Sequence, residues 1–232
     1  MNLQLKMHEG HHAHILMAFY RSLREYCGPE TGTAVFMTAA RAYGERRGRR
    51  MAMRALRDGK LLNVASYFAY GELLPTEGAY EGTYTAETGV VHEQQVRCPW
   101  ADAFRQAGGL DCAIDYCREI DRSIVCGFNP TLTFACTQNM HTCPSCDFFF
   151  YSPEIQGDFM QSYRTGLQEG QAVKRDMTYH CADVFQMFSY VVGQTLPESG
   201  VLEKVRLCLE DRFGQAFFDQ LLRYAETDFN QI

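Results

Sequence analysis

Cysteine residues concentrate in one central stretch of the chain, Asp115 to Tyr151, which also contains a histidine. It holds five of the ten cysteines and one of the seven histidines. Thiolates and imidazoles are ligands that zinc prefers, and a thiolate with a base or cation nearby is also a nucleophile. The stretch therefore predicts a metal site or a catalytic thiol.

The tightest cluster in this stretch is His141-x-Cys143-x-x-Cys146. A CxxC turn can place both sulfurs on one tetrahedral metal, which then needs a fourth ligand or a water. Cys117 on the preceding helix and Cys136 on the preceding strand are the nearest candidates. We expect a zinc site formed by Cys117, His141, Cys143 and Cys146, with no metal as the alternative.

Two other interpretations of these cysteines stay open. Cys143-Pro144-Ser145-Cys146 has the CPxC form of thiol–disulfide enzymes, although it leads into a strand-like sequence and not into a helix. Buried cysteines also pack as small apolar side chains, which is the simplest interpretation of Cys136 and Cys143 and more so of Cys112 and Cys126.

Further candidates lie on helices. His180 and Cys181 are neighbours in sequence, so on a helix they point about 100° apart and cannot pair with each other. Cys181 follows the apolar side of its helix and His180 could flank a pocket, with core packing as the alternative for both. Asp121, one turn after Cys117, could orient a histidine or bind a substrate amine, or could be a helix cap or surface carboxylate.

Basic residues crowd a single helix near the N-terminus. We expect a solvated helix face that pairs with the acidic excess elsewhere, with an anion site as the alternative, for seven arginines: Arg41, Arg46, Arg47, Arg49, Arg50, Arg54 and Arg57. Gly44 and Gly48 lie within the same helix, where each glycine costs about 1 kcal/mol relative to alanine. They indicate close packing or the approach of a ligand.

His8, His11 and His12 have a spacing that could share a metal ion on a helix. Because they lie at the fraying start of the chain, we expect an exposed polar cluster instead.

The order of the expected elements predicts an α+β fold, with an antiparallel sheet packed against N-terminal and C-terminal helices. We expect a single domain over residues 1–232, in which helices occupy 10–74, the sheet and the cysteine-rich core occupy 80–151, and helices occupy 176–230. Within these segments, helices are expected at 61–74 and 217–229. We expect residues 152–175 to form a long surface loop or lid.

Composition excludes several classes of partner. The net charge of −6 and the isoelectric point near 5.6 argue against nucleic acid, which needs a basic surface. No apolar run approaches the length of a membrane span and no signal peptide is visible, so we expect a cytoplasmic protein. Its partner should be a small-molecule substrate or ligand, and a homo-oligomer is left open.

Several short motifs, in this order along the chain, resemble the L-2-amino-thiazoline-4-carboxylate hydrolase family over roughly residues 10 to 215. They are Tyr43-Gly44-x-Arg46-Arg47-Gly48, Cys98-Pro99, Tyr116-Cys117-x-x-x-Asp121, Gly127-Phe128-Asn129-Pro130, Cys146-x-Phe148 and Tyr179-His180-Cys181. Three of these elements, Cys98-Pro99, Cys117 and Cys146-x-Phe148, are also similar to the 4-vinyl-reductase-type small-molecule-binding domain, some relatives of which bind zinc beside a ligand pocket. The chain departs from both patterns at Cys143-Pro144-Ser145, where those families have Gly-Asp.

The resemblance implies a hydrolase that breaks a non-peptide C–N bond in a small heterocyclic or amide acid, and that opens the ring of the heterocycle. The catalytic residues would be Cys117, His180, Cys146, Asp121 and Cys98, and the substrate would be bound by Tyr43, Arg46, Arg47 and Cys181, with the two arginines on its carboxylate. Either a thiolate attacks the carbon or a metal activates water. The alternative is a sensor-like small-molecule-binding domain with a structural zinc.

Overall fold

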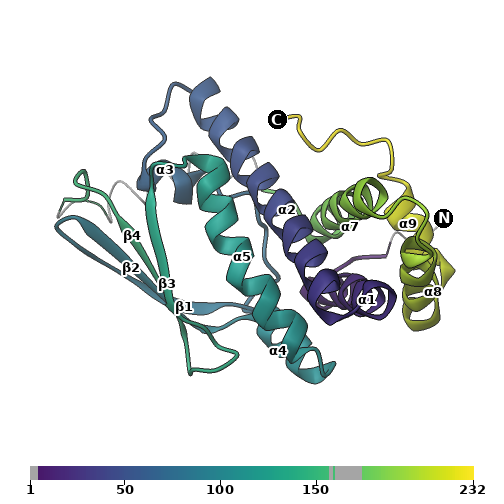
Figure 1. Cartoon of the computed structure of the whole chain (residues 1–232). Coiled ribbons are helices and arrows are strands. Elements are labelled where there is room, and N and C mark those ends of the chain that lie inside the picture. The colour runs from purple at the N-terminus through teal and green to yellow at the C-terminus, as the bar shows by residue number, and fades with distance from the viewer. Residues whose placement is uncertain (1–4, 157–158, 160–173) are drawn as a thin grey trace.

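A helical layer and an antiparallel sheet lie on opposite sides of one long helix, α5 (Leu110–Phe128) (Figure 1). The computed structural model describes residues 5–156, 159 and 174–232. The helical layer contains α1 (Glu9–Cys27), α2 (Pro29–Arg57), α7 (Met177–Thr195), α8 (Val201–Phe213) and α9 (Gln215–Leu222). The two short helices are α3 (Val64–Ala69) and α4 (Pro99–Gln106). The α+β class expected from the sequence is confirmed.

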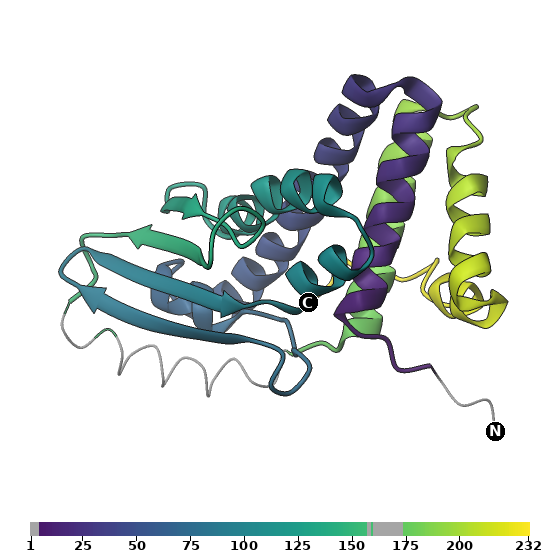
Figure 2. The same cartoon turned by 90° about the horizontal axis from the view of Figure 1, so that it is seen from below.

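The sheet consists of β1 (Glu81–Glu87), β2 (Val90–Arg97), β4 (Cys146–Tyr151) and β3 (Thr133–Gln138), in that spatial order and all antiparallel. Figure 2 shows the sheet lying apart from the α8–α9 end of the helical layer. Directly opposed residues share a face of a sheet. The register therefore places Tyr84, Glu93, Phe148 and Cys136 in one cross-strand row, and Ala86, Val91, Phe150 and Phe134 in the next.

The contact between α2 and α5 depends on glycine. A Cβ atom on Gly48 would lie 2.0 Å from the Ile124 carbonyl oxygen, and one on Gly127 would lie 2.2 Å from the Glu45 carbonyl oxygen. Gly44 is similarly close to Ser123, at 2.6 Å. The backbones of α2 and α5 can therefore approach this closely only at glycine residues. Of the two interpretations of Gly44 and Gly48, close packing or the approach of a ligand, the structure shows close packing.

Two apolar clusters fill the interior. The larger one joins the helices of the helical layer through residues such as Phe19, Phe36 and Phe188. The smaller one lies against the inner face of the sheet and contains Val91 and Phe150. The region between the helical layer and this smaller cluster is where the candidate site lies.

Two helices expected from the sequence are shorter than predicted. The helix expected at 61–74 is α3, which starts only after Asn63, whose side chain accepts a hydrogen bond from the Ser66 N–H. The helix expected at 217–229 ends at Leu222, and the chain then runs along α7, where Gln186 donates to the Thr227 carbonyl at 2.9 Å. Most of the predicted loop or lid at 152–175 lies outside the described residues.

In the described part of the chain, none of the helices combines the length and the apolar character needed to cross a bilayer.

Candidate active site

A cavity of about 270 Å³ lies between the inner face of the sheet and the helices. Its polar wall contains Arg47 and Glu72 on the helical side, Asp121 on α5, Glu93 on β2, and Lys174. The rest of the wall is largely apolar and aromatic, with Met51, Tyr67, Phe68, Leu73, Tyr84, Ile124, Phe134, Phe148 and Phe150. A concave apolar site with a few convergent charged groups is typical of a small-molecule site.

Behind the polar wall lies a buried ion cluster built on α2. Arg50 donates to Glu72 from Nε at 3.1 Å and to Asp183 from Nη2 at 2.7 Å, and each of the three side chains is at most 1% exposed. Arg54 donates to Glu72 at 2.8 Å, and Arg46 donates to the Asp183 carboxylate. The solvated helix face expected from the sequence is therefore wrong for these arginines. Helical spacing turns them toward the core, whereas Arg41, Arg49 and Arg57 lie on the exposed side.

The cluster carries more positive than negative charge. Four guanidinium groups (Arg46, Arg47, Arg50 and Arg54) share the carboxylates of Glu72 and Asp183. The neighbouring arginines hold the pKa of Glu72 well below its usual range despite its burial. A buried charge without a partner is costly, so this arrangement favours the binding of an anion.

Arg47 is the arginine of the cluster that lines the cavity, together with Glu72. Its nearest carboxylate contact is the 3.5 Å separation between its Nε and Glu72 Oε1, and its guanidinium makes no hydrogen bond with any residue that the structure describes. The guanidinium lies over the Tyr43 ring, 5.5 Å from its centroid. An arginine with free donors matches a carboxylate bidentately.

Two further carboxyl groups, those of Glu93 and Asp121, line the same cavity. Glu93 accepts hydrogen bonds from the Tyr84 hydroxyl at 2.8 Å and from Gln95 Nε2 at 2.6 Å, and burial raises its pKa. Burial, together with the charge of Glu93, raises the pKa of Asp121 to about 7, and Arg47 opposes this shift. A carboxyl group with a pKa near 7 is suited to general acid–base work.

Asp121 and Phe134 also line a second, adjoining cavity of about 290 Å³, whose wall includes Cys117 and Cys136. His141 Nε2 lies 3.2 Å from the Cys117 sulfur. Burial, with a contribution from the negative charge of Asp121, raises the pKa of the thiols of Cys98 and Cys136 to about 12 and of Cys146 to about 11. Burial, with a contribution from Asp121, also raises the pKa of the Cys117 thiol. These groups are therefore thiols, not thiolates, near neutral pH.

The predicted zinc ligands do not form a compact set. Among the residues that the structure describes, one group of three His, Cys, Asp or Glu side chains has ligand atoms all within 4.8 Å of one another, and it is Glu72, His180 and Asp183. In that group the guanidinium of Arg50 already bridges the two carboxylates, so it does not suit a metal. Cys117 and His141 are close, but with Cys143 and Cys146 they do not make such a group. The zinc expectation stays a prediction.

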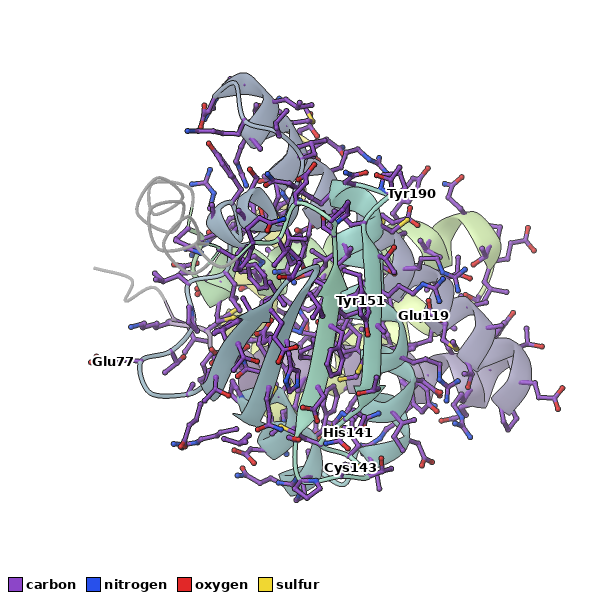
Figure 3. The ribbon with its side chains drawn as sticks, turned by 90° about the vertical axis from the view of Figure 1, so that its left-hand side faces the viewer. Glu77, Glu119, His141, Cys143, Tyr151 and Tyr190 are labelled. Carbon is purple, nitrogen blue, oxygen red and sulfur yellow. The ribbon has the colours of Figure 1, made fainter. Side chains whose placement is uncertain are left out.

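Figure 3 shows where the turn that carries His141 and Cys143 lies, at one end of the sheet, with Tyr151 further along it. Cys146 begins β4, and its sulfur accepts a hydrogen bond from the Met140 N–H at 3.3 Å. The motif leads into a strand, as its sequence indicated. The helix N-terminus that lowers thiol pKa values in thiol–disulfide enzymes is therefore missing after Cys146.

The remaining candidates lie around the cavity at different depths. Arg46 is held by Asp183 and by Gln186, so it supports the cluster from behind. Tyr43 is fully buried and its hydroxyl contacts His12 Nε2 at 3.3 Å. Cys181 is fully buried in the core of the helical layer.

His180 is buried beside Glu72, behind the residues that line the cavity. Burial lowers its pKa to about 3. It does not pair with any of the candidate cysteines. Cys98 occupies the N-cap position of α4 without a capping hydrogen bond from its side chain. Burial, with contributions from Cys146 and Asp121, raises the pKa of its thiol.

The N-terminal histidines are not the exposed cluster that was expected. His8 caps α1, but His11 is 9% exposed and His12 only 1% exposed. His12 accepts a hydrogen bond from Trp100 Nε1 at 3.0 Å through Nδ1, and burial lowers its pKa. The helix begins at Glu9 and packs against α4 and α8, which removes these rings from water.

Sequence reasoning missed Glu93, Glu72 and Lys174. Glu93 could have been found, because strand alternation places it on the same face as Val91, two residues earlier. Glu72 fell within the helix expected at 61–74 but lies beyond the end of α3 in the structure. Lys174 lies in the segment expected as a loop, and no local pattern marks either residue.

The sequence of this chain matches the family described as L-2-amino-thiazoline-4-carboxylic acid hydrolase over residues 8–150. The chain belongs to this family. The matched range contains Arg47, Glu72, Glu93 and Asp121, whereas Asp183 lies beyond it. No curated protein and no solved structure matches the chain. The similarity to 4-vinyl-reductase-type domains stays a prediction.

Proposed function

We propose that the chain hydrolyses a ring C–N bond in a small cyclic amidine acid of the 2-amino-thiazoline-4-carboxylate type, and that the reaction takes place in the cavity between the sheet and α2. The observation that carries the proposal is the combination of Arg47, whose guanidinium makes no hydrogen bond with any described residue, and two carboxyl groups in the same wall. Family membership supports hydrolysis but does not name this chain's substrate.

The charges of such a substrate complement those of the cavity. Its carboxylate would bind Arg47, where the surplus positive charge of the ion cluster favours an anion. Its amidine group, protonated, would bind Glu93, whose carboxylate Tyr84 and Gln95 orient. The substrate would thus be held at both ends, with the amidine carbon exposed to a water molecule.

Asp121 would act as the general base. It removes a proton from water as the oxygen attacks the amidine carbon, so that a C–O bond forms and the C=N electron pair moves to nitrogen. The protonated carboxyl then gives its proton to the ring nitrogen as the C–N bond breaks, and the hydroxyl proton passes to the released amine as the carbonyl forms, which leaves Asp121 ionised again. The product is a ring-opened carbamoyl acid with a free amine.

A cysteine nucleophile is the competing scheme. The short contact between His141 and Cys117 would suit it, but burial and Asp121 keep the Cys117 thiol protonated. A thiolate formed next to an ionised Asp121 would also face a like charge. We therefore assign Cys117 to the wall of the second cavity and not to attack on the substrate.

The test compares Asp121→Asn and Cys117→Ser on 2-amino-thiazoline-4-carboxylate, with the ring-opened product measured by mass. A general base contributes about 10²–10⁴-fold, so Asp121→Asn should lose at least a hundredfold in kcat. Cys117→Ser should keep more than a tenth of it. The opposite pattern, with a covalent adduct on Cys117, would establish the nucleophilic scheme, and no turnover by the wild-type chain would refute the proposed activity.

A further inference from the structure

Two residues, Asp121 and Phe134, contribute to the walls of both cavities. The second cavity lies where β3 packs beside α5 (Figure 1), and the rest of its wall consists of Cys117, Arg118, Arg122, Ala135 and Cys136. The residue to which we assign general-base catalysis therefore borders two spaces. The substrate needs only the first of them, which contains Arg47 and Glu93.

The second cavity is the better suited of the two to water. A water molecule inside a protein makes about two to four hydrogen bonds with polar groups. The wall offers it the guanidinium groups of two arginines, two thiols and the carboxyl group of Asp121. The volume of about 290 Å³ is enough for several molecules, since each takes roughly 30 Å³ in the liquid. In the first cavity, Arg47 and Glu93 are assigned to the substrate, and most of the remaining wall is apolar and aromatic.

The wall of the second cavity also reaches the surface of the protein. Cys136 and Arg122 are exposed. The Arg118 side chain is 58% exposed, with its guanidinium 3.5 Å from the Asp115 carboxylate. Asp121 lies at the inner end, where it is only partly exposed. The second cavity therefore connects solvent with Asp121 along a path that does not pass the residues assigned to the substrate.

Phe134 is held at the junction of the two cavities by aromatic neighbours. Its ring centroid is 5.0 Å from that of Phe150 and 5.9 Å from that of Phe148. Cys136 follows two residues later, so it lies on the same face of β3, and it is opposite Phe148 in the register. Because Phe134 lines both cavities, its side chain forms part of the partition between them.

We propose that the second cavity is the route by which the hydrolytic water reaches Asp121, while the substrate is bound in the first cavity. The proposal rests on the hydrolysis proposed above and adds a separate entrance for its second reactant. Each turnover consumes one water molecule, and a general base acts on a water within about 2.6–3.2 Å. With Phe134 between the two spaces, a new water molecule reaches Asp121 from solvent without release of the substrate.

A ring placed in the second cavity tests this route. Cys136→Trp should lower kcat for 2-amino-thiazoline-4-carboxylate by at least about tenfold, because Asp121 provides its roughly 10²–10⁴-fold only with a water in reach. KM should stay within about twofold, because the substrate is bound in the other cavity. Thr133→Trp is the matched control. Thr133 is opposite Tyr151 on the other face of β3, so the same side chain there should leave kcat and KM unchanged.

A measurement without turnover separates this inference from the proposed hydrolysis. Carbon-13 NMR of the aspartate carboxyl groups would follow the titration of Asp121, assigned with Asp121→Asn. The first cavity would be occupied by 2-aminothiazole-4-carboxylate, an aromatic analogue that resists hydrolysis. Loss of water from the second cavity should raise the pKa of Asp121 by at least about half a pH unit in Cys136→Trp, through desolvation. Thr133→Trp should leave this pKa unchanged.

An unchanged kcat or an unchanged pKa in Cys136→Trp, a rise in KM alone, or an equal loss in Thr133→Trp would overturn the inference. If the pKa rises in Cys136→Trp but wild type does not hydrolyse the ring acid, the proposed hydrolysis fails and the access of water to Asp121 stands. Should Cys136→Trp not fold, as judged by urea denaturation, Cys136→Leu places a smaller apolar side chain at the same position. It should change kcat and the pKa in the same directions.

Discussion

Single substitutions of the α2 arginines distinguish those that stabilise the fold from Arg47, to which we assign ligand binding. Arg50 bonds both buried carboxylates and also donates to the Phe229 carbonyl at 2.7 Å. Among the described residues, the carboxylate nearest to Arg47 is that of Glu72, at 3.5 Å, and its buried Nε makes no hydrogen bond with any of them. The two residues should therefore respond differently to substitution by methionine, which keeps the length of the apolar stem.

The magnitudes follow from the contacts that each arginine makes. Breaking a buried ion pair costs about 3–5 kcal/mol, and because Arg46 and Arg54 still pair with Asp183 and Glu72, Arg50→Met should cost about 3 kcal/mol. Arg47→Met removes a buried donor whose missing hydrogen bond costs the folded state about 1–3 kcal/mol. It also removes part of the surplus positive charge. Its free energy of unfolding should stay within about 1 kcal/mol of wild type, or rise.

Urea denaturation of both variants measures these changes, with Arg49→Met as the matched control. The Arg49 side chain is 62% exposed and its nearest carboxylate contact is the 4.0 Å separation from Glu45, so its loss should change stability by no more than about 0.5 kcal/mol. If Arg47→Met were as destabilising as Arg50→Met, Arg47 would be a structural member of the cluster. That result would refute its assignment as the ligand-binding arginine.

Three further predictions follow from the same geometry. Activity should rise with pH through about 7 as Asp121 ionises, because a base must be deprotonated; a pH–rate profile that is flat between pH 5 and 9 would contradict this. The raised pKa also means that the contribution of Asp121 itself to stability falls from about pH 4 to 7, so Asp121→Asn should gain stability relative to wild type over this range and be the more stable protein at pH 8 but not at pH 4. Gly48→Ala should lower the free energy of unfolding by several kcal/mol, because its Cβ would meet the α5 backbone. Gly193→Ala on α7 is the control and should stabilise the protein slightly, because a Cβ there has nothing within 4 Å. Equal effects in thermal or urea unfolding would rule out the close helix contact.

Much of the fold could be predicted from periodicity and from breaking residues. The strand pair around Gly89, the helix that ends near Gly59 and the strand that follows the CxxC turn all occur close to the expected positions. Local patterns were insufficient for α3 and α9, whose ends depend on a cap and on contacts with distant residues. Periodicity does not carry information on such contacts.

The candidate site was harder to predict because its key property is burial. A run of arginines on a helix is ordinarily solvated, and only the tertiary pairing with Glu72 and Asp183, 22 and 133 residues from Arg50, makes it a buried cluster. Asp121 and Arg47 were named from the sequence and both line the cavity. The number of cysteines directed the sequence prediction to thiol chemistry, whereas the charged groups that line the cavity are glutamate, aspartate, arginine and lysine side chains.

Turnover by the purified chain tests the central claim most directly. Wild type and Arg47→Met would each be given 2-amino-thiazoline-4-carboxylate and 2-amino-thiazoline without the carboxylate, and kcat/KM would be measured from the ring-opened product. Loss of a charge-assisted bidentate contact should cost Arg47→Met at least about tenfold on the acid and almost nothing on the compound that lacks it. Equal losses on both compounds, or none on the acid, would contradict an active site in which Arg47 binds the substrate carboxylate.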